Sequence, residues 1–563
     1  MQKRWVFPQN LDSSLVKKLA GELKIPMAVA SLLIARGFVT AVEASSFLDP
    51  RLASLRPPEE IPGISAAVER LIVALKNKEP ILLYGDYDVD GITSLAFLAR
   101  FLRAAGGIIE CFIPERAHEG YGLSAAGVER SLGKYQPKLM IVVDCGTNSF
   151  KEAATICKRG IELIILDHHE PQSKTAAEFC AALINPKFGE SYHYLCSIGL
   201  VFKLCHAFLK KHPVAGLDLR DYLDFVALGT VADIVPLQEE NRIFVRRGLR
   251  QLAASRWLGI KALIAVAGVT APCTAFDIGF KLGPRINAVG RLGSADEALR
   301  LLLTDDSSEA AIIAARLDAD NRERQNVERL VTQEAEKWVT ANFHAAQAGI
   351  VVGQSGWHQG VVGIVASRIA KRWHRPTLVI GFDEQGNGKG SGRGINGISL
   401  VEALESCSPL LTAFGGHAMA AGLSLHKSQL EALRTTFQKK SRELLSDEDL
   451  IPRLQLDAEI NLAEVSYEWL ALQERLAPFG IGNPQPLFFS RGVRLAKEPR
   501  ILKEKHFRFD FLTPQKKSIA AIFFNGATDP LPQQPWDIAF TIEQNTYQGR
   551  SELQLQIAAI KKS

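Results

Sequence analysis

The chain has 563 residues, enough for about three to five domains of ordinary size. Hydrophobic residues make up 47% and charged residues 23%, a composition that excludes a disordered, collagen-like or disulfide-stapled chain. The net charge is only +5, but residues 491–563 hold 12 Lys and Arg against 7 Asp and Glu, and the rest of the chain is balanced. This distribution is typical of a solvated basic surface or of a region that binds a polyanion.

The eight cysteines are scattered and form no Cys-x-x-Cys pair, which favours free thiols in a reducing compartment over a zinc site. No apolar stretch is long enough to cross a membrane, and the first residues, MQKRWVFPQNLDSS, lack the apolar core of a signal peptide. We therefore expect a cytoplasmic protein that has no membrane partner.

The first half of the chain alternates helices and strands. Residues 14–37 predict two short helices, and three apolar strands open the segments PILLYGDYDVDG (80–91), LMIVVDCGT (139–147) and IELIILDHHE (161–170). Helical patterns between these strands predict parallel βαβ units whose sheet is covered on both faces. Residues 222–237 predict a further helix, which we expect to break at Gly229.

The second half predicts three more parts. Residues 306–343 contain few helix breakers and predict a long linking helix. Residues 348–373 have the pattern of a strand, a Gly-rich turn and a helix, which predicts a second α/β domain. From residue 453, short β-type runs separated by turn residues predict a small antiparallel barrel or sandwich.

Acidic and imidazole side chains gather where the three apolar strands end. The first strand is followed by Asp86, Asp88 and Asp90, the second by Asp144, and the third by Asp167, His168 and His169. Because ligands of an open parallel sheet bind beyond the carboxyl ends of its strands, we expect these side chains to share one edge. Asp233, just after Gly229, is a candidate fourth contributor.

Such a cluster predicts a pair of divalent cations. Buried carboxylates repel one another and are costly to desolvate unless something neutralises them. Carboxylates suit Mg²⁺ or Mn²⁺, an imidazole favours Mn²⁺, and two metals activate water for phosphoryl chemistry. Asp144, at a central strand end, is placed to bridge them. The alternative is that each Asp is a helix cap or turn former, which fits a lone residue better than three clusters.

The motifs GDYDVDG, VVDCGT, DHHE and GTVADIVPL resemble, in order, the four motifs of the DHH phosphoesterase superfamily, and GGHAMAAG (415–422) resembles the signature of its DHHA1 domain. PERAHEGYGL (114–123), GPRINAVGRLG (283–293) and the C-terminal β-type region resemble the RecJ family. The resemblance implies an α/β fold class with two α/β domains joined by a long helix and a C-terminal OB-like β-barrel. The implied parts are a helical segment (1–45), a DHH catalytic domain (46–305), a connecting helix (306–344), a DHHA1 domain (345–450) and an OB-fold nucleic-acid-binding domain (451–563).

The resemblance also implies an activity. It implies a single-strand-specific 5′→3′ DNA exonuclease of recombination and repair, which releases 5′-mononucleotides with two Mn²⁺ or Mg²⁺ ions. Single-stranded DNA would enter a channel between the DHH and DHHA1 domains. The implied partners are single-strand-binding protein and a RecQ-type helicase, and the implied state is a monomer.

Residue roles follow from the matching motif positions. The implied metal ligands are Asp88, Asp90, Asp144, His168 and Asp233, with Asp144 shared and His169 facing the scissile phosphate. Smaller DHH phosphatases have a His four residues before the first DxD aspartate, where this chain has Tyr84. Asp86 is the candidate replacement ligand, and its alternative role is a turn former.

Further positions are expected to bind the DNA strand. These are Arg116 at the substrate end, Tyr121 as a base-stacking ring, Arg285 and Arg291 on backbone phosphates, Ser391 and Arg393 in GKGSGRG (388–394) as a 5′-phosphate pocket, and His417 as a substrate contact. Read alone, GKGSGRG predicts a flexible hairpin loop, and the glycines around His417 serve tight packing equally well. Phe507, Phe509 and Phe511 alternate along one strand and predict either base stacking or, preferably, barrel core.

Two rival functions stay open. One is another DHH enzyme, namely a nano-RNase, a cyclic-dinucleotide phosphodiesterase or a pyrophosphatase, but such chains are typically shorter or membrane-tethered and lack the basic β-type tail. The other is an inactive scaffold of a replication helicase, a class that has generally lost the acidic ligands present here.

Overall fold

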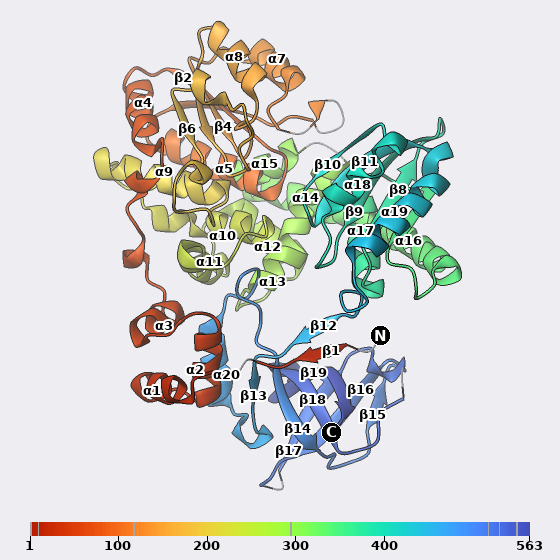
Figure 1. The fold of residues 1–563 in the computed structure, drawn as a ribbon. Helices are drawn as coiled ribbons and strands as arrows, with labels where there is room; N and C mark the ends of the chain where they lie inside the picture. The colour runs from red at the N-terminus through yellow and green to blue at the C-terminus, as the bar shows by residue number, and fades with distance from the viewer. Residues whose placement is uncertain are drawn as a thin grey trace. The chain divides into compact units, whose positions relative to one another are not determined.

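The computed structural model describes residues 3–8, 11–115, 119–120, 122–292, 295–515, 517–528, 530–547 and 550–563. The chain forms two compact units, whose elements are labelled in Figure 1. The larger unit comprises Val6–Gly290, Ser294–Ala314 and Gln455–Ser563, and the smaller unit comprises Met1–Trp5, Arg291–Gly293 and Ala315–Leu454.

A five-stranded parallel sheet organises the α/β part of the larger unit. Its order is β3 (Ile108–Phe112), β2 (Pro80–Gly85), β4 (Leu139–Val143), β5 (Glu162–Leu166) and β6 (Ala182–Ile184). All of β4 is buried, as expected for a strand that is apolar on both faces. The three predicted strands are the central β2, β4 and β5, which confirms the predicted parallel arrangement, and β3 and β6 add the two edges.

Helices cover both faces of this sheet. On one face, α7 (Ala125–Lys134) and α8 (Phe150–Lys158) share a core with strand residues such as Met140 and Ile165. On the other face, α5 (Val89–Ala104) contacts β2, α9 (Ser197–Lys211) contacts β5, and α4 (Ile64–Lys76) contacts β6. The remaining longer helices of this part are α10 (Leu223–Ala232), α11 (Glu239–Leu252), α12 (Leu258–Ala267), α14 (Gly283–Leu292) and α15 (Asp296–Leu303).

Gly229 does not break its helix. Because α10 runs through it, the predicted break is wrong. A Cβ at Gly229 would lie 2.6 Å from Thr93 Oγ1, closer than real Cβ atoms approach, and in tight contact with Asp90 Oδ1 at 3.0 Å. Gly229 therefore allows α10 to approach α5 closely. Interpreting this glycine as a helix breaker overlooks its role in packing.

The smaller unit contains most of α16 (Ser307–Asn342), which confirms the predicted long helix. Its sheet has the order β10 (Ala413–Gly416), β11 (Ala420–His426), β9 (Asn387–Arg393), β8 (Thr377–Phe382) and β7 (Ile350–Ser355), with only β7 and β8 parallel among these described strands. Its helices include α17 (Val362–Trp373), α18 (Leu400–Glu405) and α19 (Leu430–Leu444).

The Gly-rich segment GKGSGRG is a strand, so the prediction of a hairpin loop is wrong: β9 is the central strand of its sheet. Its alternate glycines face the filled side of the sheet. A Cβ would lie 2.5 Å from the Phe382 ring at Gly388, 2.7 Å from Ile380 at Gly390 and 2.7 Å from Leu378 at Gly392. The intervening positions Lys389, Ser391 and Arg393 consequently share the opposite face.

The C-terminal part of the larger unit is a seven-stranded sheet. Its order is β13 (Ala458–Glu459), β14 (Phe488–Val493), β18 (Trp536–Tyr547), β19 (Arg550–Lys562), β17 (Ser518–Phe523), β16 (His506–Leu512) and β15 (Arg500–Leu502). It shares one hydrophobic core with α1 (Ser13–Leu23), α2 (Met27–Ala35), α3 (Ala41–Leu48) and α20 (Tyr467–Leu476).

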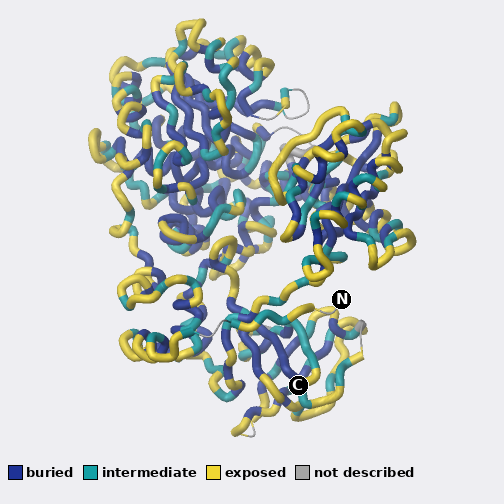
Figure 2. The backbone as a smooth tube through the Cα atoms, in the orientation of Figure 1, coloured by how far each residue is buried: buried dark blue, intermediate teal, exposed yellow. Residues whose placement is uncertain are grey.

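Phe507, Phe509 and Phe511 lie in this core, where Phe509 and Phe511 are fully buried. Figure 2 shows buried stretches, in dark blue, along the strands of this sheet. The core interpretation of the aromatic stripe is therefore confirmed, and these rings are not available to stack on bases. The helices α1 and α2 match the two predicted N-terminal helices, and α3 follows them. A separate two-stranded sheet joins β1 (Arg4–Val6) to β12 (Arg453–Gln455).

These parts confirm the predicted α/β fold class with a C-terminal β-domain. Pairings among the described strands leave β13 and β15 at opposite ends of the seven-stranded order, so the sheet order is open where a closed barrel was expected. In the described part of the chain, no helix combines the length and the apolar character that crossing a membrane requires.

Two glycine substitutions test the packing of the larger unit. Gly248 of α11 is buried, and a Cβ there would lie 2.1 Å from the Leu223 carbonyl oxygen. We expect Gly248→Ala to lower the free energy of unfolding by about 1–3 kcal/mol, because α10 and α11 must separate. The matched control is Gly21→Ala in α1, which meets nothing within 4 Å and should raise stability by up to about 1 kcal/mol. Urea denaturation measures both, and equal effects would contradict this packing.

Candidate metal centre

Seven acidic and imidazole side chains meet at the carboxyl edge of the parallel sheet. Asp86 follows β2, Asp88 and Asp90 start α5, Asp144 follows β4, His168 and His169 follow β5, and Asp233 follows α10. They form three overlapping groups whose nearest ligand atoms lie within 4.8 Å of one another: Asp86, Asp88 and Asp144; Asp90, His168 and Asp233; and Asp144, His168 and His169. The sheet thus brings the predicted metal-ligand residues together, with Asp144 in two groups.

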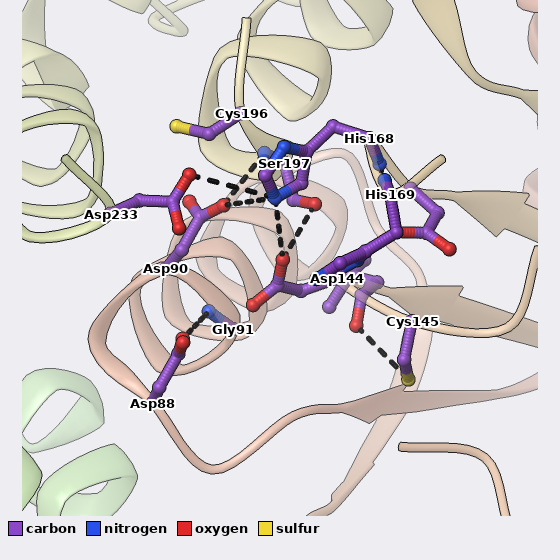
Figure 3. Close-up of polar contacts among 12 residues, drawn as sticks. Asp88, Asp90, Gly91, Asp144, Cys145, His168, His169, Cys196, Ser197 and Asp233 are labelled. Atoms are coloured by element: carbon purple, nitrogen blue, oxygen red, sulfur yellow. Dashed lines mark hydrogen bonds and ion pairs between the residues drawn. The ribbon is translucent and has the colours of Figure 1, made fainter. Parts of the chain in front are cut away.

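His168 lies at the middle of the cluster (Figure 3). Its Nε2 is 3.4 Å from Asp144 Oδ1, 3.5 Å from Asp233 Oδ2 and 3.9 Å from Asp90 Oδ2. Burial, and then the neighbouring His169, lower the pKa of His168 to about 4. The ring is therefore neutral at physiological pH, which is the form of imidazole that binds a metal.

The backbone is shaped to bring these groups close. Asp144 has φ 64°, in the left-handed region that Asp tolerates better than most residues, and this turns the chain sharply at the end of β4. Gly91 lets the first turn of α5 close over the preceding loop, since a Cβ there would lie 2.4 Å from the carbonyl oxygen of Asp86. Asp88 is the N-cap of α5 and accepts from Gly91 N at 3.1 Å, so the capping role and the cluster coincide.

The carboxylates of the cluster carry raised pKa values. Burial, with repulsion from Asp88, raises the pKa of Asp86 and of Asp90 to about 7. Burial, with repulsion from Asp90 and Asp88, raises the pKa of Asp233 to about 9, and the pKa of Asp144 also lies well above its usual range for the same reasons. The site therefore holds protons at neutral pH unless positive charge replaces them.

Asp167 has the opposite character. It accepts from the backbone N–H groups of Thr147 at 2.9 Å and His168 at 2.8 Å, and its Oδ1 lies 2.7 Å from His169 Nδ1. Although burial alone would raise its pKa, these bonds hold it well below the usual range. The same pair raises the pKa of His169 against the effect of burial. Asp167 thus orients His169 and is a site residue that the motif analysis did not assign a role.

Unsatisfied buried atoms mark the place of a cation. Among the described residues, His168 Nε2 and Asp233 Oδ2 make no hydrogen bond, and the Asp86 carboxylate has none of normal geometry. A buried polar atom without a partner costs about 1–3 kcal/mol, more if charged, so a ligand is expected. Carboxylate oxygens with one imidazole are the donor set of Mn²⁺ and Mg²⁺, and the residues fit such ions.

Tyr84 takes no part in the site. It is fully buried, its hydroxyl donates to the Gly122 carbonyl at 3.1 Å, and its ring stacks on Phe112. Tyr84 is therefore a core residue and supplies no ligand. Asp86 lies in the same group as Asp88 and Asp144, as a replacement ligand must.

The predicted DNA-binding residues are spread over both units. In the larger unit, Arg285 of α14 donates to the Lys281 carbonyl at 2.6 Å. In the smaller unit, Arg393 Nη1 donates to Ser391 Oγ at 2.9 Å, and the exposed His417 lies in the β10–β11 hairpin. The side chain of Arg291 lies outside the described part of the chain, and Arg116 and Tyr121 lie outside the described residues.

Ser197 contacts two carboxylates of the cluster, and no sequence motif predicts this. Its backbone N–H donates to Asp90 Oδ2 at 2.7 Å, and its hydroxyl donates to Asp144 Oδ1 at 3.0 Å. It lies well beyond the DHHE motif, at the start of an ordinary amphipathic helix, so nothing in the sequence pattern points to it.

Three family models match the chain. They are the N-terminal domain of the DHH family at residues 80–230, the DHHA1 domain at 342–443 and the RecJ OB domain at 456–559. Curated relatives named single-stranded-DNA-specific exonuclease RecJ match nearly the whole chain. The Haemophilus influenzae protein is 34% identical over 92% of this chain and 94% of its own, and the Escherichia coli protein is 34% identical over 95% and 96%.

Two further comparisons extend this picture. The Bacillus subtilis RecJ is 39% identical over 86% of this chain, and this chain spans 61% of its length. The crystal structure of RecJ from Thermus thermophilus in complex with Mn²⁺ matches with a TM-score of 0.85 and 29% identity, over all of this chain and 80% of that one. With three family models in order and the Haemophilus influenzae and Escherichia coli relatives matched over nearly their full length, the chain belongs to the RecJ family.

Proposed function

We propose that the chain is a metal-dependent exonuclease specific for single-stranded DNA, which degrades its substrate 5′→3′ and releases 5′-mononucleotides in DNA recombination and repair. The observation that carries this proposal is the cluster of buried carboxylates around His168, whose unsatisfied atoms fit two divalent cations. The names of the RecJ relatives supply the substrate class, single-stranded DNA.

The proposed ligands fall into two sets that share Asp144. Asp86, Asp88 and Asp144 would hold one Mn²⁺ or Mg²⁺ ion, and Asp90, His168 and Asp233 the other; Asp144, which also groups with His168 and His169, is the ligand proposed to serve both. When bound, such a pair supplies a hydroxide nucleophile at neutral pH and neutralises charge that develops on the phosphate. The residues themselves fix the oxygen and nitrogen donors in place before substrate arrives, because each belongs to a rigid strand or helix end.

His169 is proposed to face the scissile phosphate. Its Nδ1 lies 2.7 Å from Asp167 Oδ1, a contact that fixes the orientation of the ring. The bond to Asp167 raises the pKa of His169 against the effect of burial, which favours the protonated form of the ring. A protonated imidazole can stabilise the departing oxygen or donate a proton to it.

Ser391 and Arg393 are proposed to bind the 5′ phosphate. Arg393 is partly buried, and burial lowers its pKa. No carboxylate among the described residues forms an ion pair with it, so its charge is available to a phosphate. A Cβ at Gly363, in the first turn of α17, would lie 3.1 Å from Ser391 Oγ, so the helix start adds backbone N–H groups beside the pair.

The remaining roles are carried over from the family resemblance. Arg116, Tyr121, Arg285, Arg291 and His417 are proposed substrate contacts. Single-strand-binding protein and a RecQ-type helicase are the proposed partners, and a monomer is the proposed state. If the chain were a small-substrate DHH enzyme, the RecJ OB region at 456–559 would have no role. If it were an inactive scaffold, the complete set of candidate metal ligands would be unexplained.

The activity is tested with a single-stranded oligonucleotide labelled at its 3′ end. With Mn²⁺ we expect a ladder of progressively shorter labelled products, none in EDTA, and a blunt duplex left intact. Asp144→Asn should reduce the rate at least about 100-fold, because it removes the ligand shared by both sets. Asp49→Asn, at an exposed surface ion pair, is the control. Hydrolysis of dinucleotides without digestion of long strands would instead identify a small-substrate enzyme.

The phosphate pocket is tested by comparing 5′-phosphorylated and 5′-hydroxyl strands. Arg393→Met should lower kcat/KM for the phosphorylated strand about 10–100-fold and leave the hydroxyl strand nearly unchanged, because a charge-assisted bond is lost. Lys371→Met, an exposed cation in the last turn of α17, is the matched control. An equal loss on both strands would refute a specific role of Arg393 at the 5′ end.

A further inference from the structure

Ser197 joins two candidate metal ligands that come from different elements. It is the first residue of α9 and is fully buried. Its backbone N–H donates to Asp90 Oδ2 at 2.7 Å, and its hydroxyl donates to Asp144 Oδ1 at 3.0 Å (Figure 3). One residue therefore contacts a carboxylate from α5 and a carboxylate from the end of β4.

The start of α9 holds Asp90 in a fixed orientation. Ile198 N donates to the other carboxylate oxygen, Asp90 Oδ1, at 2.9 Å, so both oxygens are held by successive backbone N–H groups. Cys196, the N-cap of α9, makes no side-chain capping bond. The Asp90 carboxylate, which comes from α5, caps the first N–H groups of α9 instead. The positive end of a helix of 15 residues also favours the charged form of Asp90.

The hydroxyl of Ser197 donates to the Asp144 oxygen that lies beside His168. The same Oδ1 lies 3.4 Å from His168 Nε2. A hydroxyl donates one hydrogen, so it occupies one lone pair of this oxygen and leaves the other for a cation. Rotation of the Asp144 carboxylate would break this bond and would disturb both groups of ligands to which Asp144 belongs.

We propose that Ser197 is a positioning residue that fixes Asp90 and Asp144 relative to each other and thereby sets the spacing of the two metal positions. The proposal rests on the proposed metal centre. In this role Ser197 acts through the two carboxylates that it contacts. Groups of this kind, one contact removed from the metal, commonly change metal affinity about 10–100-fold when they are lost.

The test is calorimetric titration of the metal-free chain with Mn²⁺ alone. Ser197→Ala removes the hydroxyl and keeps both backbone N–H groups. We expect it to raise the Kd for Mn²⁺ at least about tenfold. Ser197→Gly, which also lacks the hydroxyl, should give the same loss. The matched control is Ser131→Ala, because Ser131 is a buried serine of α7 whose hydroxyl donates to the Val128 carbonyl at 2.9 Å, outside the cluster.

A double-mutant cycle separates positioning from general stability. In the Asp144→Ala background, Ser197→Ala should cause no further loss of Mn²⁺ affinity, because the oxygen that accepts from the Ser197 hydroxyl is already gone. If Ser197→Ala binds Mn²⁺ within twofold of the unmodified chain while its thermal midpoint matches that of Ser131→Ala, the positioning role is overturned. If the unmodified chain binds no Mn²⁺, the proposed metal centre itself fails.

Discussion

The repulsion among buried carboxylates at the ends of β2 and β4 is the constraint around which the larger unit is built. Burial and mutual repulsion raise the pKa values of Asp86 and Asp90 to about 7 and of Asp233 to about 9. Such a cluster destabilises a fold unless protons, cations or oriented N–H groups compensate. The N-terminus of α9 supplies N–H groups to Asp90, and the sheet supplies a rigid frame.

That frame explains why the fold suits the chemistry. Neighbouring parallel strands end at one edge, so β2, β4 and β5 deliver their following residues to one place. Gly91 and Gly229 allow the backbone to approach the cluster more closely than any side chain would permit. The carboxylates of the cluster differ in their surroundings: hydrogen bonds hold the pKa of Asp167 below its usual range, whereas burial and repulsion raise the pKa of Asp144 well above it. This contrast gives His169 a charged partner and leaves the other carboxylates ready for cations.

The sequence predicts the α/β order well, because apolar runs and acidic strand ends are local patterns. Prediction from the sequence fails where tertiary packing determines the local structure. Gly229 is read as a break from its identity alone, yet the need for it lies in α5, more than a hundred residues away in sequence. GKGSGRG is read as a loop because its glycines match no strand pattern, although the side chains of β8 fill the face that those glycines leave free.

The site residues likewise divide into those that the sequence motifs predict and those that only the tertiary structure reveals. Motif spacing suffices to group Asp88, Asp90, Asp144 and Asp233, which the structure places together. Ser197 is not predicted from the sequence, because its role arises from the approach of α9 to two other elements. A single sequence carries no signal for such an approach.

The most direct test of this account is the pH dependence of stability with and without Mn²⁺. Without metal, the folded chain retains a proton on Asp233 up to a pH of about 9, whereas the unfolded chain releases it near pH about 4, and the raised pKa of Asp144 acts in the same direction. The free energy of unfolding should therefore fall by up to about 1.4 kcal/mol per pH unit per retained proton as the pH rises from about 4 to about 9. Excess Mn²⁺ should abolish or reverse this fall, and Asp233→Asn should reduce it. A free energy of unfolding that does not fall with pH in EDTA and does not respond to Mn²⁺ would contradict the account.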